Sequence, residues 1–270
     1  MMEPDQAELD AQIVDSHVAK WLHQAPEMDV ALPFTGAGRA RARLWGALLS
    51  EWLDALFGLT DLHVAEVKLA WWGEALSMPA EEAPHPLVQA LGQTTNQAVS
   101  AAQWQTMAEA ALRLLGRETS PADMNALIQV RLPLAQALNE VETTLWPQTG
   151  PGNAQAVARN LVLEQWRRHH HQADVQPAWL PLQLLARHGL RARAAYAMED
   201  VAASQHLLAD LATTLASIPV TEAGPRLRRL RTRLDSRILL RLGAGRKHAF
   251  ALSGFSVPWQ CWRAVRGVPA

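Results

Sequence analysis

Five neighbouring residues in the second half of the chain have side chains that often hold metal ions or phosphate groups. They are Arg167, Arg168 and the run of three histidines from His169 to His171. Imidazole is a common metal ligand, so the run could suggest a metal site. Successive residues of a helix point about 100° apart, however, so the three rings cannot converge on one ion. Only Asp174 offers a further ligand at helical spacing, and the run therefore does not predict a metal site.

A pair of adjacent tryptophans, Trp71 and Trp72, lies in a stretch that predicts a helix from Asp61 to Met78. Asp61 is a favoured N-cap residue, and Thr60 would serve equally well. Adjacent indoles on a helix lie about 100° apart, which predicts one ring in the core and the other beside it. Apolar residues at three- and four-residue steps predict the face that packs against the protein, namely Val64, Val67, Ala70, Trp71, Ala75 and Met78.

Seven arginines alternate with leucine and isoleucine between Arg226 and Arg241. One interpretation is a bundle helix with a solvated basic face. The other is a surface that meets anionic lipid head groups. Binding to nucleic acid is not favoured, because no aromatic residues interleave the arginines and the formal net charge of the chain is only −1.

The elements that must position these residues are all predicted to be helices. Little of the sequence alternates with a period of two, and neither an internal repeat nor a low-complexity linker is present. We expect one all-α domain over residues 1–270. Pro26 and Pro33 bracket a predicted loop, Gly36 and Gly38 precede the next helix, and Ser120 with Pro121 predicts a helix start. The predicted helices span residues 6–24, 39–57, 61–78, 86–116, 121–145 (with a kink at Pro133), 153–173, 181–189, 191–218 and 226–242.

Composition limits the class of protein. An apolar content of 49% with 19% charged residues is typical of a soluble globular chain. The single cysteine, Cys261, excludes an internal disulfide and a cysteine-based metal site. The acidic N-terminus does not resemble a secretory signal, and no run of about 18 apolar residues predicts a membrane span. We therefore expect a cytoplasmic protein.

Four stretches together resemble the squalene/phytoene synthase family. The sequence KLAWWGEAL at residues 68–76, followed by HPLVQAL at 85–91, is similar to the tryptophan-rich helix and the turn of that family. Weaker similarities are WLPLQLLARHGL at 179–190, FALSGFSVPWQCWRA at 250–264 and ALPFTGAGRARARLWGAL at 31–48. These matches follow the order of the family. The resemblance implies an isoprenoid-synthase-type helical bundle with a central apolar cavity.

Enzymes of this family join two prenyl diphosphates head to head, and they hold Mg²⁺ on two aspartate-rich motifs. Where the first motif, D-D-x-x-D, is expected, this chain has Ser50, Glu51, Trp52, Leu53 and Asp54. Only Glu51 and Asp54 are acidic there. They lie three residues apart on one helical face and could hold an ion weakly.

The second motif, D-x-x-x-D, is replaced more completely. By position Arg168 stands for its first aspartate and Gln172 for its last, and no carboxylate lies between Glu164 and Asp174. Family enzymes also use a tyrosine on the middle helix, whereas the single tyrosine here, Tyr196, comes later. We therefore expect neither a Mg²⁺ cofactor nor ordinary head-to-head prenyl transfer.

Two functions are consistent with the resemblance. In the first, the protein binds a prenyl lipid or prenyl diphosphate, with the diphosphate on Arg167, Arg168 and His171 and the chain near Trp71 and Trp72. In the second, it is a non-catalytic binding or assembly protein with a protein partner, similar to the phytoene-synthase-like assembly factor of mitochondrial complex I, and the arginines are solvated residues of an abandoned site. Either protein could lie at the inner face of a membrane.

Overall fold

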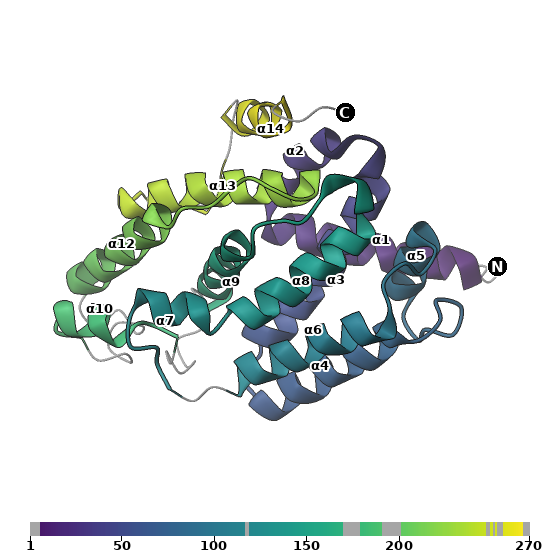
Figure 1. Cartoon of the computed structure of the whole chain (residues 1–270), viewed down its shortest axis with the longest axis horizontal. Coiled ribbons are helices and arrows are strands. Elements are labelled where there is room, and N and C mark those ends of the chain that lie inside the picture. Colours follow the sequence, from purple (N-terminus) through teal and green to yellow (C-terminus); the bar gives the residue numbers. More distant parts are fainter. Residues whose placement is uncertain are drawn as a thin grey trace, which may run out of the picture.

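The computed structural model describes residues 6–116, 119–169, 179–190, 201–246, 249–250, 252 and 256–266. Within these ranges the secondary structure is entirely helical, which confirms the all-α prediction (Figure 1). The elements are α1 (Gln6–Gln24), α2 (Pro26–Ala31), η1 (Leu32–Gly38), α3 (Arg39–Phe57), α4 (Leu62–Ser77), α5 (Pro86–Thr95), α6 (Ala101–Leu115), α7 (Met124–Gln129), α8 (Leu132–Leu145), η2 (Pro147–Thr149), α9 (Ala154–His169), α10 (Leu182–Arg187), α12 (Val201–Ser217), α13 (Arg226–Gly243) and α14 (Ser256–Arg266).

Helix α3 lies at the centre of the N-terminal half and packs against α1, α4, α5 and α9. Its buried residues include Trp45 and Trp52, which join one hydrophobic core that extends into the helices on either side. Figure 1 shows the pair α4 and α6 along one edge of the molecule and α13 along the opposite edge. Helices α8 and α9 lie between these edges and connect the two halves.

Several helix starts follow from capping chemistry. The Asp61 side chain accepts hydrogen bonds from the backbone N–H groups of His63 and Val64, as the sequence predicts for the start of α4. At α5 the cap is His85, whose Nδ1 accepts from Leu87 N at 3.1 Å. Ser100 begins α6 with a reciprocal capping box.

Two predicted boundaries are wrong in the N-terminal half. Residues 26–33, predicted as a loop, form α2 and the start of the short helix η1, because Pro26 and Pro33 each lie in a first turn, where proline is compatible with a helix. The single helix predicted over 86–116 is two helices. Asn96 and Gln97 adopt left-handed backbone angles, φ 49° and 52°, and break the chain between α5 and α6.

The helix predicted over 121–145 is also two helices. Asp123, not Ser120, caps the first of them, α7, by accepting from Ala126 N at 2.8 Å. The break falls at Val130 and Arg131, so that Pro133 lies in the first turn of α8 and kinks nothing.

Most of the side of α4 that was predicted to face the protein is exposed; of the six predicted residues only Ala75 is buried. Trp72 is buried and Trp71 is partly exposed, as expected for adjacent rings, but Val64, Val67 and Met78 are each about half exposed. The buried face combines Leu69, Trp72 and Leu76 with the small residues Ala65, Gly73 and Ala75, and α6 lies very close to it. A Cβ atom added at Gly73 would lie 2.7 Å from Ala108 Cβ. Close packing of two helices requires small residues at the contact. The side of α4 that carries Gly73 therefore faces α6, and the side with Val64 and Val67 faces outward.

In the ranges given above, no helix has both the length and the apolar character needed to cross a bilayer.

Candidate functional site

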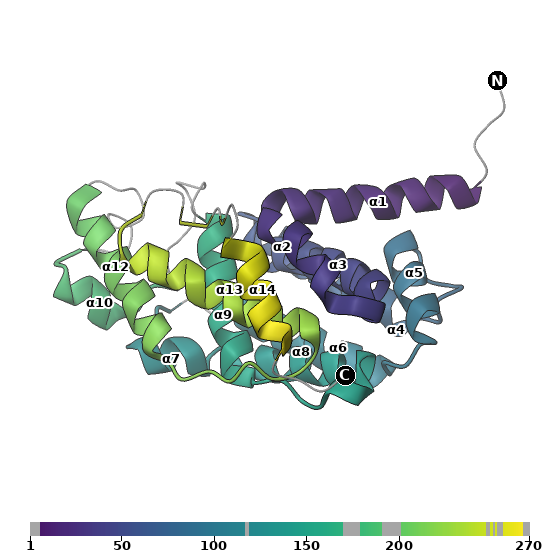
Figure 2. The same ribbon diagram turned by 90° about the horizontal axis from the view of Figure 1, so that it is seen from above.

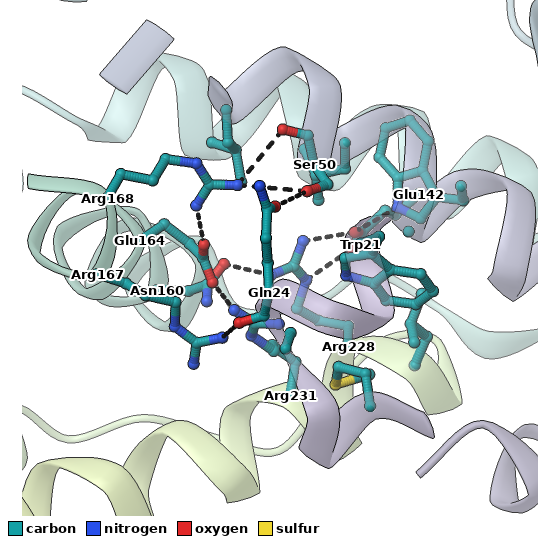
Figure 3. Close-up of a pocket in the computed structure, with 17 residues that line it drawn as sticks. Trp21, Gln24, Ser50, Glu142, Asn160, Glu164, Arg167, Arg168, Arg228 and Arg231 are labelled. Carbon is teal, nitrogen blue, oxygen red and sulfur yellow. Dashed lines mark hydrogen bonds and ion pairs between the residues drawn. The ribbon is translucent and has the colours of Figure 1, made fainter. Parts of the chain in front are cut away.

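A small pocket lies where α1, α3, α9 and α13 meet, and four arginines line it (Figure 3). Helix α9 contributes Arg167 and Arg168, and α13 contributes Arg228 and Arg231. The space in this pocket that water-sized molecules can occupy is only about 50 Å³. This space holds a few waters and does not establish the large central cavity that the resemblance implies.

Arg168 links two acidic residues from different helices. Its Nε donates to Asp54 Oδ1 at 2.8 Å, and its Nη1 pairs with Glu164, one turn earlier on α9. A weaker contact joins Nη2 to Ser50 O at 3.4 Å. Burial lowers the pKa of the Arg168 guanidinium, and the charge of Asp54 offsets this only in part. The guanidinium therefore lies between α3 and α9 and pairs with one carboxylate from each helix.

Arg167 points to the neighbouring helix α2. Its Nη2 donates to Glu27 Oε1 at 2.9 Å, and its Nη1 donates to Gln24 O at 3.2 Å. Two buried polar atoms at this contact, Arg167 Nε and Glu27 Oε2, have no hydrogen-bond partner in the part of the chain that the structure describes. Buried polar atoms of this kind are commonly satisfied by water or by a ligand.

The arginines of α13 are also paired. Arg228 donates from Nε to Glu142 Oε2 at 2.8 Å and from Nη2 to Oε1 at 2.5 Å, a bidentate contact. Trp45 Nε1 donates to the same carboxylate at 3.0 Å. Burial alone would lower the pKa of Arg228, but Glu142 outweighs this effect and raises it. Arg231 pairs with Glu164 and Asp235.

The remnant acids Glu51 and Asp54 share one face of α3, as predicted, but cations already occupy them. Lys20 Nζ lies 2.7 Å from Glu51 Oε1 and 2.9 Å from Asp54 Oδ2, and His17 Nδ1 lies 3.0 Å from Glu51. Burial would raise the pKa of Glu51, but hydrogen bonds from Lys20 and His17 hold it below its ordinary value. The pKa of Asp54 is likewise lowered, against the effect of burial, chiefly by the charge of Arg168.

The donor set does not fit the Mg²⁺ cluster that the resemblance implies. Mg²⁺ requires carboxylates free to coordinate it, whereas Glu51, Asp54 and Glu164 each contact a lysine or an arginine. Among the described residues, no three His, Cys, Asp or Glu side chains are placed together to hold a metal.

Other predicted site residues lie elsewhere. Trp71 and Trp72 do not line the pocket and instead pack around His85, with ring centroids 6.1 and 5.0 Å from the imidazole. His171 falls outside the described residues. The proposed roles of these three residues stay predictions.

The solvated basic face predicted between Arg226 and Arg241 is only partly correct. Arg228 and Arg229 are buried, and Arg233 pairs with Glu222 at 2.8 Å. Arg237 is exposed. Part of the arginine set faces inward because Arg228 pairs with the buried Glu142 and Arg231 pairs with the buried Glu164.

Sequence reasoning missed the acidic partners Glu27, Glu142 and Glu164, and it treated Arg228 and Arg231 as surface residues although they line the pocket. A signal was present on α9, where Asn160, Glu164 and Arg168 recur every four residues and therefore lie on one face. Apolar residues surround these three positions, so they indicate a buried polar stripe.

Comparisons with protein-family models, with curated proteins and with solved structures gave no match to this chain. What the fold and the pocket define directly is an all-helical protein with a buried network of ion pairs at its centre.

Proposed function

We propose that this chain is a single-domain helical bundle of the squalene/phytoene synthase type that acts as a binding or assembly protein and not as a Mg²⁺-dependent prenyltransferase. The observation that carries the proposal is the position of Arg168 between Asp54 and Glu164. Ionisation of an allylic diphosphate needs acidic groups that hold Mg²⁺ against the leaving pyrophosphate. Here the acids of the two facing helices neutralise arginine and lysine instead.

The charge balance supports the same proposal. The four pocket arginines have Glu27, Asp54, Glu142, Glu164 and Asp235 as partners. A diphosphate would have to displace these carboxylates or bear their repulsion. The exposed apolar side of α4, with Val64, Val67 and Trp71, also favours a protein that contacts another macromolecule.

The proposal is tested with purified protein and farnesyl or geranylgeranyl diphosphate, with and without Mg²⁺. We expect no pyrophosphate release under either condition. A Mg²⁺-dependent release that Asp54→Asn abolishes would overturn the proposal, because it would show that Asp54 still serves catalysis. Glu109→Gln, a change at an exposed acid on α6, is the matched control.

A second candidate is a prenyl diphosphate ligand that binds without turnover, and the unpartnered Arg167 Nε in the pocket favours it. The ligand would then raise the unfolding temperature of the wild type in proportion to its affinity. Replacing Arg167 by Gln would abolish this shift, whereas Arg113→Gln, at an exposed arginine on α6, would leave it intact. An unchanged melting temperature in wild-type protein would exclude this candidate and leave the assembly function.

A further inference from the structure

Helix α14 is an amphipathic helix on the outside of the molecule. Figures 1 and 2 show it lying across the outer side of α13, next to α2. Its inner face packs on these helices through Val257, Cys261 and Ala264, all buried. Its outer face carries Trp259, Trp262, Arg263 and Arg266; Trp262 and Arg263 each lie three or four residues from Trp259 and from Arg266, so the four side chains share one side of the helix.

The outer face combines aromatic rings with positive charge. Trp259 is 54% exposed, although large aromatic side chains are usually buried. It stacks on Trp262, with ring centroids 4.9 Å apart and ring planes inclined by 22°. The Arg266 guanidinium lies 3.8 Å from the Trp262 ring centroid. Helix α14 contains no acidic residue, whereas the whole chain has a net charge of −1, so the positive charge here is local.

We propose that the outer face of α14 docks this protein on an anionic phospholipid surface. Tryptophan prefers the boundary between head groups and acyl chains, because its ring is apolar and its N–H is a donor. Arginine at the same level binds lipid phosphates through its planar fork of donors. The helix lies on the surface of the protein with its opposite face buried, which is the arrangement of a helix that rests in the plane of a membrane interface.

The ring geometry favours lipid over nucleic acid. Single-stranded nucleic acids bind by stacking bases on free aromatic faces. Trp259 stacks on Trp262, and Arg266 also lies over the Trp262 ring. The stacked contact covers one face of Trp259, and both contacts take up ring surface of Trp262 that a stacking base would need. Insertion of Trp259 between lipid head groups needs no free stacking face.

This surface is distinct from α13, although both are rich in arginine. Of the α13 arginines, Arg228 and Arg229 are buried and Arg231 and Arg233 are in ion pairs. The exposed Arg237 therefore serves as an internal comparison: it lies on α13, the helix on which α14 packs, but it is not part of the tryptophan–arginine face.

The test is flotation of the full-length protein with vesicles of phosphatidylcholine alone or of phosphatidylcholine mixed with phosphatidylglycerol. We expect binding only to the anionic vesicles, with weaker binding as salt is raised. Trp259→Ala and the double change Arg263→Gln with Arg266→Gln should each lower the partition coefficient about tenfold or more. Leu182→Ala, at an apolar side chain of α10 that is 53% exposed, and Arg237→Gln should leave it within about twofold of the wild type.

Equal thermal unfolding of all variants confirms that they fold, which is expected for changes at exposed side chains. The proposal is overturned by wild-type protein that does not float with anionic vesicles. It is also overturned if the Leu182 and Arg237 variants lose as much binding as the α14 variants, or if the α14 face binds single-stranded RNA and not vesicles. None of these outcomes depends on whether the central pocket binds a ligand.

Discussion

Arg168 is the residue on which the central charge network depends most directly. Its side chain is about 10% exposed and lies between two carboxylates, Asp54 and Glu164. An ion pair that is buried to this degree adds little net stability compared with apolar residues of the same size. Removing one partner is a different matter, because it leaves charges of like sign close together and out of water.

We therefore predict that Arg168→Ala lowers the free energy of unfolding by about 3 kcal/mol. Urea unfolding at neutral pH measures the change. Arg113→Ala is the matched control, since Arg113 pairs with Glu109 on the surface of α6 with both side chains 69% exposed. That change should cost about 0.5 kcal/mol or less. Equal losses in the two variants would mean that the Arg168 pairs are as weak as surface pairs.

The sequence indicates some residues of this site, but it does not indicate which acidic side chain pairs with which basic one. Arg167, Arg168, Glu51 and Asp54 stand out from motif positions, and two of them contact each other in the structure. The pairs themselves join distant positions, with Arg168 and Asp54 separated by 114 residues and Arg228 and Glu142 by 86. No local pattern encodes such a separation. Only the packing of α3, α8, α9 and α13 decides which acid meets which base.

At the scale of elements, the sequence predicted where most helices lie, but the prediction missed the breaks within residues 86–116 and 121–145. Residues 6–24 and 39–57 begin and end where their apolar periodicity predicts. The break between α5 and α6 has neither glycine nor proline at its positive-φ positions, Asn96 and Gln97. Its weaker signals are the asparagine, which tolerates left-handed angles, and the Ser100–Gln103 capping box that begins α6. The exposed apolar side of α4 could not be predicted either. The contact of Gly73 with α6 decides which side is buried, and the sequence alone does not show that these two helices touch.

Capping makes α4 dependent on one side chain. Asp61 accepts two backbone hydrogen bonds, from His63 N at 2.9 Å and from Val64 N at 3.2 Å. Asp61→Ala should lower the free energy of unfolding by about 1 kcal/mol, because the first turn loses its acceptor. Asp61→Asn retains an acceptor oxygen and should cost only a few tenths of that amount. Thermal unfolding of both variants checks this order, and a larger loss in Asp61→Asn would contradict the capping role.

The start of α5 should respond to mild acid. Burial lowers the pKa of His85 below its ordinary value of 6.5, and His17, whose ring centroid lies 4.9 Å away, lowers the pKa further, whereas Glu51 opposes this. The neutral ring is the form that caps α5. The unfolded chain therefore takes up a proton at higher pH than the folded protein, and His85 makes stability fall as the pH drops below about 6.5.

His85→Asn isolates this effect, because asparagine can accept the same hydrogen bond and does not titrate. We expect the variant to lose less stability than the wild type between pH 7 and pH 5, measured by urea unfolding at several pH values. Identical slopes in this window would show that His85 does not contribute to the pH dependence.

At the scale of the whole molecule, the ion pairs connect helices that are far apart in sequence. Lys20 on α1 contacts Glu51 and Asp54 on α3, and Asp54 contacts Arg168 on α9. Glu164 then connects α9 with Arg231 on α13. Because these contacts cross most of the bundle, acid should loosen it as a unit and not one helix at a time.

The pKa values of Glu51 and Asp54 both lie below their ordinary values of 4.5 and 3.8. A carboxylate with a lowered pKa contributes stability that is fully present above its ordinary pKa and is lost as the pH falls toward the folded-state pKa. The free energy of unfolding of the wild type should therefore decrease steeply below about pH 4.5.

The variant with Glu51→Gln and Asp54→Asn should be less stable at pH 7, because Lys20 and Arg168 lose their partners. It should also have a flatter profile between pH 5 and pH 3, so that the two curves approach each other in acid. Parallel curves would show that these two carboxylates do not determine the acid sensitivity of the bundle.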